Sequence, residues 1–297
     1  MEIQRTRGLR ETPKDSRDFK LGASFRLPDL EDLPKNFVFE QISVKDQKST
    51  DFCSAFMTTY MSEIQEDIEL SPEWSFAVSK MISGDVDGWG QNLRDAMKVH
   101  TQYGALPKDV APFSLENKTD EFLRNIQSWP KQLFEKAKAH KKKSYFKVEG
   151  RYDAFDDIRA SIWLFREKKQ SVGLGVMWGW GNDPIIPKED FDGFGHAVAC
   201  IGWKDINGEP YLVIHNSYGK TAGDNGGFYF PREIINKNVA RFGAYMFVDM
   251  DPKDAKMEQW SIIRQIYEGI RTRFNALFEY LAKAIQPTYY PWVKINL

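Results

Sequence analysis

The chain of 297 residues has only two cysteines, Cys53 and Cys200. Two cysteines are too few for a disulfide framework, so an ordinary apolar core must hold the fold together. The length is sufficient for one large domain or two modest ones with such a core. Sparing use of cysteine also favours a reducing compartment, and we expect the protein to be cytoplasmic.

The sequence also lacks a net charge of either sign and a long apolar run. Its 41 Lys and Arg residues nearly balance 42 Asp and Glu residues, for a formal net charge of −1. This balance gives no reason to expect a nucleic-acid partner. No stretch approaches about eighteen uncharged apolar residues, which excludes a transmembrane helix. The first residues, MEIQRTRGLRETPKDSRDFK, lack the apolar centre of a signal peptide.

The first half of the chain has mainly helical patterns. Prolines interrupt the polar residues 1–40, which predicts an extended N-terminal arm. Over residues 53–67 apolar side chains recur every four positions, and this spacing predicts a helix with one apolar face. Ser71-Pro72 supplies an N-cap and a first-turn proline to a second helix. Further helices are expected over 93–102 and over the charged stretch 117–143.

The second half has mainly β patterns. From about Ser144 onward, runs rich in β-branched and aromatic residues predict strands, with one helix over about 156–166. Asn207-Gly208 joins two such runs and predicts a hairpin turn. We therefore predict an α+β fold of two packed lobes, the first mainly helical (41–143) and the second mainly antiparallel β (144–250).

Residues 251–297 are predicted to form a C-terminal extension. Ile and Leu side chains recur along one face between about 256 and 285, which predicts an amphipathic helix. The polar face carries charges of both signs, unlike a helix that lies on a membrane surface. An aromatic tail, QPTYYPWVKINL, follows. We expect packing on the preceding two lobes, or self-association or binding of a protein partner through residues 254–297.

Three short segments carry residues suited to thiol chemistry. VKDQKSTDFCSAF places Gln47 six positions before Cys53, and Cys53 opens the first predicted helix. GHAVACIGW contains His196, and YLVIHNSYG contains Asn216. In this order the segments resemble those around the nucleophile, histidine and asparagine of papain-like cysteine peptidases. His196 lies about 140 positions after Cys53, within the range typical of that family.

The resemblance implies a papain-like two-lobe fold over residues 41–250 and a thiol endopeptidase acting on peptide or protein substrates. It implies that Cys53 is the nucleophile, His196 its base, and Asn216 the residue that orients the base. Gln47 and the backbone N–H of Cys53 would bind the oxyanion. A helix N-terminus and an imidazolium would lower the pKa of the thiol. This chemistry needs no metal and no organic cofactor.

The resemblance also implies a substrate-binding surface. Gly88, Trp89 and Gly90 occupy the loop where the family has an adjacent pair of glycines that binds extended peptides. Gly195 precedes the histidine, and Tyr218 stands where a tryptophan usually shields the His–Asn hydrogen bond.

Several departures from the family leave other interpretations open. Asp51 adds a carboxylate beside the thiol, which would raise its pKa, and Ser54 replaces an aromatic residue. One alternative is a transpeptidase or ligase that uses the same acyl-enzyme. Another is a catalytically impaired binding or assembly module. The arm is too short for the long helical propeptide of lysosomal relatives. The layout resembles bacterial and viral members, so we expect a bacterial or phage origin, with a virion-associated location if a phage encodes it.

Overall fold

The computed structural model describes residues 8–40, 43–85, 88–111, 125–179, 181–189, 193–250 and Phe274. The chain divides into two compact units, Met1–Pro252 and Lys253–Leu297. The predicted C-terminal helix over 256–285 and the aromatic tail lie outside the described residues, except for Phe274, which is helical and exposed.

The first unit contains helices and one antiparallel sheet. The helices are α1 (Leu21–Ser24), α2 (Cys53–Glu66), α3 (Pro72–Ser83), α4 (Leu93–Gln102), α6 (Lys131–Lys138), α7 (Ala154–Leu164) and α8 (Arg232–Phe242). The strands are β1 (Phe37–Val38), β2 (Ser144–Lys147), β3 (Val172–Trp178), β4 (Phe194–Ile206), β5 (Glu209–His215), β6 (Gly227–Phe230) and β7 (Ala244–Val248). The sheet has the order β2-β7-β3-β4-β5-β6, and β1 pairs with β4.

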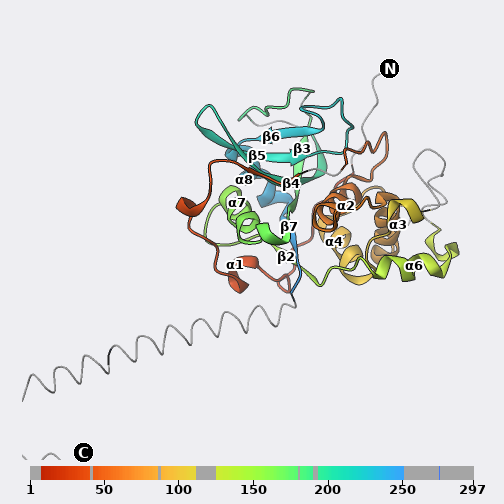
Figure 1. The fold of residues 1–297 in the computed structure, drawn as a ribbon. Coiled ribbons are helices and arrows are strands. Elements are labelled where there is room, and N and C mark those ends of the chain that lie inside the picture. The colour runs from red at the N-terminus through yellow and green to blue at the C-terminus, as the bar shows by residue number, and fades with distance from the viewer. Residues whose placement is uncertain are drawn as a thin grey trace, which may run out of the picture. The chain divides into compact units, whose positions relative to one another are not determined.

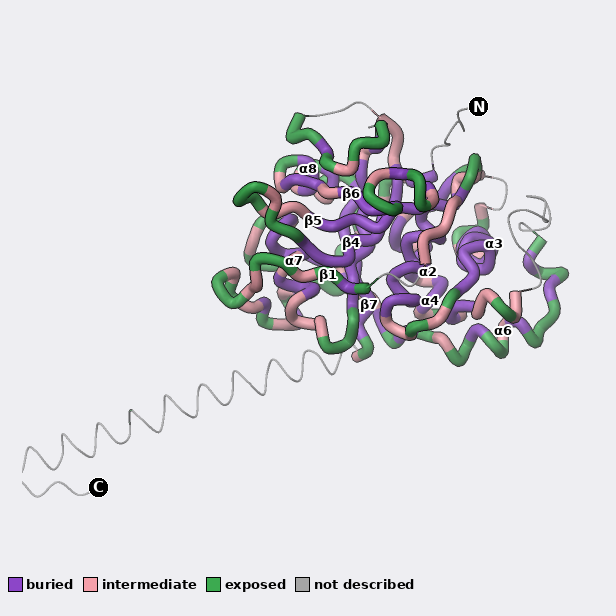
Figure 2. Tube along the Cα trace, turned by 45° about the horizontal axis from the view of Figure 1, so that its top comes forward, coloured by how far each residue is buried: buried purple, intermediate pink, exposed green. Residues whose placement is uncertain are grey.

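The elements form two lobes, as the sequence predicts. Helices α2, α3, α4 and α6 gather on one side, and the sheet with α7 and α8 lies on the other (Figure 1). Buried residues run through α2 and the central strands, whereas exposed residues are concentrated in the peripheral loops (Figure 2). The predicted α+β, papain-like arrangement is thus confirmed.

Helix α2 packs directly on the sheet at Gly173 of β3. A Cβ at position 173 would lie 2.6 Å from Sδ of Met57 and 2.7 Å from Sδ of Met61. Because glycine has no side chain, both methionines of α2 can lie against the strand. Met57 and Met61 are almost fully buried there. This contact sets the position of α2, and with it the position of the residue that opens the helix.

Two local sequence signals are confirmed in atomic detail. The Ser71 hydroxyl accepts a hydrogen bond from the Trp74 N–H at 3.3 Å, so Ser71 caps α3. Asn207 and Gly208 both have positive φ, 56° and 90°, as the predicted tight turn between β4 and β5 requires.

One predicted helix is wrong over part of its length. The charged pattern predicts a helix over 117–143, of which residues 117–124 lie outside the described part. The described remainder has a 3₁₀ turn at Ile126–Ser128, and α6 begins only after Pro130. Proline has no backbone N–H and restricts the residue before it, so it separates the two elements. The chain then leaves the helix after Lys138 to enter β2.

Truncation of Met61 tests the importance of the contact between α2 and the sheet. We expect Met61→Ala to lower the free energy of unfolding by about 2–5 kcal/mol, because it leaves a cavity between α2 and β3. Urea unfolding followed by circular dichroism measures the change. Met81→Ala, at a partly buried position of α3, is the matched control and should cost less. An equal loss in the two variants would contradict the assigned role of Met61.

Candidate active site

Cys53 is the first residue of α2 and is fully buried. The preceding residue, Phe52, occupies the N-cap position without a side-chain cap. Its ring stacks on that of Phe76 of α3, with centroids 3.6 Å apart. The start of α2 is therefore held by aromatic packing. The thiol lies at the positive end of the helix dipole, as the sequence predicts.

His196 lies on β4, against the start of α2. The backbone of Ala197, the next residue, is close enough to the sulfur of Cys53 to lower the pKa of the thiol. Packing of α2 against β4 thus brings the cysteine segment and the histidine segment together. His196 is fully buried.

Asn216 follows β5 and holds the imidazole of His196 from the next strand. Nε2 of His196 donates to Oδ1 of Asn216 at 2.7 Å. The same oxygen accepts from the Ser217 N–H at 2.8 Å, which fixes the orientation of the amide. The ring proton therefore lies on Nε2. Tyr218 and Trp178 cover the imidazole, with ring centroids 4.7 Å and 5.2 Å from it.

Gln47 is fully buried beside the segment that carries Asn216. Its Oε1 accepts from the Ser217 hydroxyl at 2.6 Å, and its Nε2 donates to the Thr50 carbonyl at 2.8 Å. Its backbone N–H donates to the Ser217 carbonyl at 2.8 Å. A primary amide has two N–H donors, so the bond to Thr50 engages one of them. These bonds fix the side chain a few residues before Cys53.

The backbone of the predicted substrate-binding loop, Gly88 to Gly90, is held mainly by two charged side chains of the helical lobe. The ammonium of the buried Lys80 donates to the carbonyls of Gly88 and Gly90. The N–H of Gly90 donates to the Asp51 carboxylate. Trp89 is half exposed. The backbone that pairs with an extended strand is that of the next residue, Gln91.

That strand is the N-terminal arm of the same chain. The Gln91 N–H donates to the Gly8 carbonyl at 3.0 Å, and the Gln91 carbonyl accepts from the Arg10 N–H at 2.8 Å. From the other side of the cleft, the Gly195 carbonyl accepts from the Leu9 N–H at 3.2 Å. The arm is therefore bound as an added strand between the loop of the helical lobe and β4.

Gly8 lies directly on the thiol. A Cβ at position 8 would lie 2.6 Å from Sγ of Cys53 and 2.8 Å from the Asp51 carbonyl oxygen. Only glycine fits there without a shift of the backbone. Neither Gly8 nor Gln91 was among the site residues predicted from the sequence. Gln91 does follow the predicted loop directly, but nothing in the arm indicates that it returns to the cleft.

Burial raises the pKa of the Cys53 thiol to about 12, although the backbone of Ala197 lowers it; the Asp51 carboxylate adds to the increase. The sequence predicts that the helix and the histidine lower this pKa and that Asp51 raises it. The difference follows from the complete burial of the sulfur, to which Gly8 of the arm contributes, because a thiolate deprived of water is disfavoured. With the arm bound, the sulfur is therefore held as the neutral thiol.

The remaining histidines and the second cysteine lie away from this chemistry. His215 is buried edge-on against the ring of Tyr60, and burial lowers its pKa to about 4. His100 bonds to the Ser62 and Ser75 hydroxyls inside the helical lobe. Cys200 is a buried residue of β4. Among the described residues, no group of three or more His, Cys, Asp or Glu side chains could hold a metal ion.

Comparison with solved structures places the fold among cysteine proteases. Xylellain, a cysteine protease from Xylella fastidiosa, aligns with a TM-score of 0.64 at 22% identity, over 84% of this chain and 100% of that chain. Procathepsin B S9 from Trypanosoma congolense aligns with a TM-score of 0.53 at 16% identity, over 82% of this chain and 84% of that chain. A procathepsin L 3 from the larval midgut of Tenebrio molitor gives 0.53 at 17%, over 77% and 73%. At these identities the likeness establishes the fold.

The two-lobed fold, with a cysteine at the start of α2 facing a histidine strand, defines a cysteine peptidase. The model of the papain family of cysteine proteases matches residues 33–246, and the chain belongs to this family. A comparison with curated proteins gave no match. In the part of the chain that the structure describes, no helix is long and apolar enough to cross a membrane.

Displacement of the arm should activate the thiol. We expect Gly8→Val to remove the arm from the cleft, because the new side chain would collide with Sγ of Cys53. Water would then reach the sulfur, its pKa would fall from about 12, and more thiolate would be present at neutral pH. The rate of iodoacetamide labelling of Cys53, measured from pH 5 to 11, increases as the thiol ionises. This increase should therefore occur at a lower pH in the variant than in the parent.

Gly181→Val is the matched control for this experiment, since a Cβ at Gly181 meets no atom within 4 Å. It should leave the pH profile of the parent unchanged. Identical profiles for the parent and Gly8→Val would show that the arm does not control access to the thiol.

Proposed function

We propose that the protein is an endopeptidase that hydrolyses peptide bonds through a thioester on Cys53, with His196 as base and Asn216 as the residue that orients it. The observation that carries this proposal is the bond from His196 Nε2 to Asn216 Oδ1, in a strand that packs against the helix opened by Cys53. With its proton on Nε2, the imidazole has Nδ1 as its basic atom. Nδ1 can accept the thiol proton.

The reaction proceeds in two halves. Proton transfer from Cys53 to Nδ1 of His196 leaves a thiolate, which adds to the carbonyl carbon of the scissile bond. When the C–N bond breaks, the amine leaves with the proton from His196, and a thioester remains. A water molecule then gives a proton to His196 and adds to the thioester carbon. The C–S bond breaks, the acid product leaves, and the proton returns to the sulfur.

Asn216 has a positioning role in this scheme. Its Oδ1 is itself held by the Ser217 N–H, so it maintains the ring orientation while the histidine gains and loses a proton. Tyr218 and Trp178 exclude water from the His–Asn bond, which strengthens it in a low-dielectric surrounding.

Gln47 and the Cys53 N–H are proposed to stabilise the oxyanion. The bonds of Gln47 to Ser217 and Thr50 preorganise its amide. One amide hydrogen remains for the developing negative charge. A substrate must first displace the arm, since Gly8 covers the sulfur.

Thiol labelling and peptide hydrolysis test the assignment of Cys53 and His196. In the Gly8→Val background, we expect an epoxide inhibitor to add once, on Cys53, as shown by intact mass and peptide mapping. His196→Ala should reduce both labelling and hydrolysis of a peptide mixture by about 10³-fold or more, because the base is lost. Cys200→Ser, which alters a buried cysteine of the same strand, is the matched control and should retain the activity.

Equal labelling of Cys53 with and without His196 would mean an ordinary thiol and a binding module instead of a peptidase. Ligated products in the presence of an added amine, identified by mass, would instead favour a transpeptidase.

A conservative change of Gln47 tests the oxyanion role separately from folding. Gln47→Glu keeps an acceptor for the Ser217 hydroxyl but replaces the donor with a carboxylate. We expect kcat to fall about 10²–10³-fold with little change in KM, because the lost interaction exists only in the transition state. Ser217→Ala, which removes a support of Gln47 but not the donor, should have a smaller effect. A fall of the same size in both variants would indicate a structural role for Gln47.

A further inference from the structure

The arm shows where a basic side chain binds beside the thiol. Nη1 of Arg10 donates to Oδ2 of Asp85 at 2.6 Å, and Nη2 donates to the Gly90 carbonyl at 3.1 Å. The guanidinium thus spans a carboxylate and a backbone carbonyl on the edge of the cleft. Both partners belong to the loop that fastens the arm as a strand. The two bonds orient the planar group as well as its charge.

Asp85 is oriented independently of the arm. Its Oδ1 accepts from the Gly88 N–H at 3.0 Å, and its own N–H donates to the Ser83 hydroxyl at 3.3 Å. One carboxylate oxygen therefore fixes the side chain to the loop, and the other is directed to the guanidinium. The Arg10 guanidinium lowers the pKa of the Asp85 carboxyl, so the carboxylate is charged at neutral pH.

The charges around the loop favour a cation in the place of Arg10. Asp51 and Asp85 both bind N–H groups of the loop, and the ammonium of Lys80 binds two of its carbonyls. Together these three side chains carry one net negative charge when Arg10 is absent. Lys80 is buried, whereas the Asp85 side chain is 40% exposed even with Arg10 bound to it.

The contacts of three consecutive arm residues show how far this subsite lies from the thiol along a bound strand. Gly8 covers Cys53, Leu9 packs against Gly175 of β3, and Arg10 reaches Asp85. An extended peptide that replaces the arm would pair with the same N–H and carbonyl of Gln91 and the same carbonyl of Gly195. Such edge pairing places successive side chains on alternate sides. Gly8 and Arg10 are two positions apart and therefore lie on the same side of the strand. In a bound peptide, the side chain two positions from the residue that faces the sulfur would therefore meet Asp85.

We propose that Asp85, with the Gly90 carbonyl, is a specificity-determining subsite that selects substrates with an arginine or lysine side chain near the scissile bond. This inference rests on the proposed peptidase function and names its substrate class. Arg10 of the arm occupies the subsite until a substrate displaces it.

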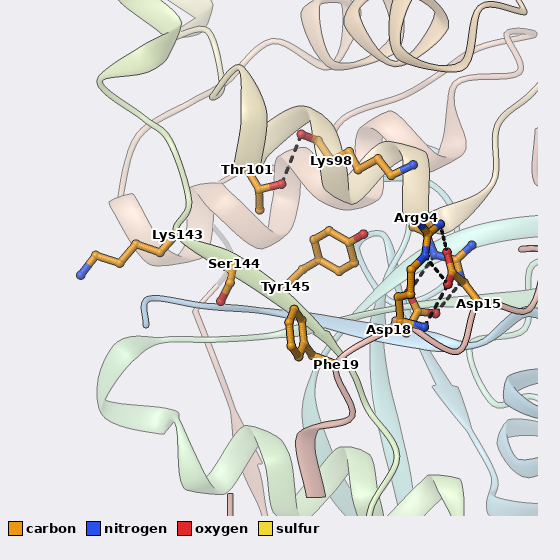
Figure 3. Close-up of a pocket in the computed structure, with 10 residues that line it drawn as sticks. Asp15, Asp18, Phe19, Arg94, Lys98, Thr101, Lys143, Ser144 and Tyr145 are labelled. Atoms are coloured by element: carbon orange, nitrogen blue, oxygen red, sulfur yellow. Dashed lines mark hydrogen bonds and ion pairs between the residues drawn. The ribbon is translucent and has the colours of Figure 1, made fainter. Parts of the chain in front are cut away.

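The arm is also tied down beyond the cleft, so it holds Arg10 in the subsite as part of an ordered segment. Arg94 of α4 donates from Nε to Asp18 at 2.8 Å and from Nη2 to the same carboxylate at 2.5 Å. Figure 3 shows this pair at one end of a pocket of about 620 Å³, with Asp15 beside it. Arm residues past the cleft are thus fixed by an ion pair of their own. A competing peptide needs to replace only the cleft contacts.

The experiment uses the full chain with Gly8→Val and Arg10→Ala, which empties the cleft, with and without Asp85→Asn. Asparagine retains an acceptor for the Gly88 N–H but has no charge. Each protein is given peptides that differ only in arginine or its neutral isostere citrulline at successive positions, and cleavage is followed by mass. We expect kcat/KM to favour arginine about tenfold at one position when Asp85 is present, and we expect this preference to vanish in the Asp85→Asn protein.

The ratio within each protein cancels any general change in activity. A preference that persists in Asp85→Asn, or no preference at any position, would overturn the subsite while leaving the peptidase function intact. If no peptide is cleaved and Cys53 is not labelled, the proposed function fails instead. Binding of fluorescent TRGLRET and its citrulline copies to the same two proteins, read by anisotropy, then decides the subsite: an arginine preference that requires Asp85 supports it, and equal binding refutes it.

Discussion

The packing of the start of α2 against β4 determines the rest of the site. The helix approaches the sheet closely because Gly173 leaves room for Met57 and Met61. Cys53, at the N-terminus of the helix, then lies against the backbone of Ala197, the residue that follows His196. Neither lobe contains a complete site, since the helical lobe supplies the thiol and the β lobe supplies the histidine and the asparagine. The apolar contact between the lobes therefore controls the distance between the Cys53 thiol and the His196 imidazole.

The same junction explains why a strand can bind across it. Gln91 presents its N–H and carbonyl from the helical lobe, and Gly195 presents a carbonyl from the β lobe. An extended chain between them satisfies backbone groups at both edges, and the arm does so through Gly8, Leu9 and Arg10. Burial of Cys53, to which Gly8 of the arm contributes, raises the pKa of the thiol. The protonation state of the sulfur thus depends on what occupies the cleft.

Local sequence signals predict those elements that depend on interactions between residues close together in the chain. The Ser71 cap, the Asn207-Gly208 turn and the division into two lobes were all foreseeable, since capping, turn chemistry and periodicity are short-range effects. The helix predicted over 117–143 was wrong over its described part near Pro130. There Pro130 interrupts the charged stretch and separates the 3₁₀ turn from α6. The order of the segments with Cys53, His196 and Asn216 indicates the family from the sequence alone.

The sequence by itself determined the class of fold, the family and the candidate residues Gln47, Cys53, His196 and Asn216, because their identities and spacings lie within short segments. Tertiary structure alone decided that Gly8–Arg10 lies on the thiol, that Gln91 is the residue that binds a strand, and that Asp85 receives a guanidinium. These contacts join residues far apart in the chain, 75 positions in the case of Arg10 and Asp85. Such pairings depend on how the lobes pack, and no local pattern in the chain specifies them.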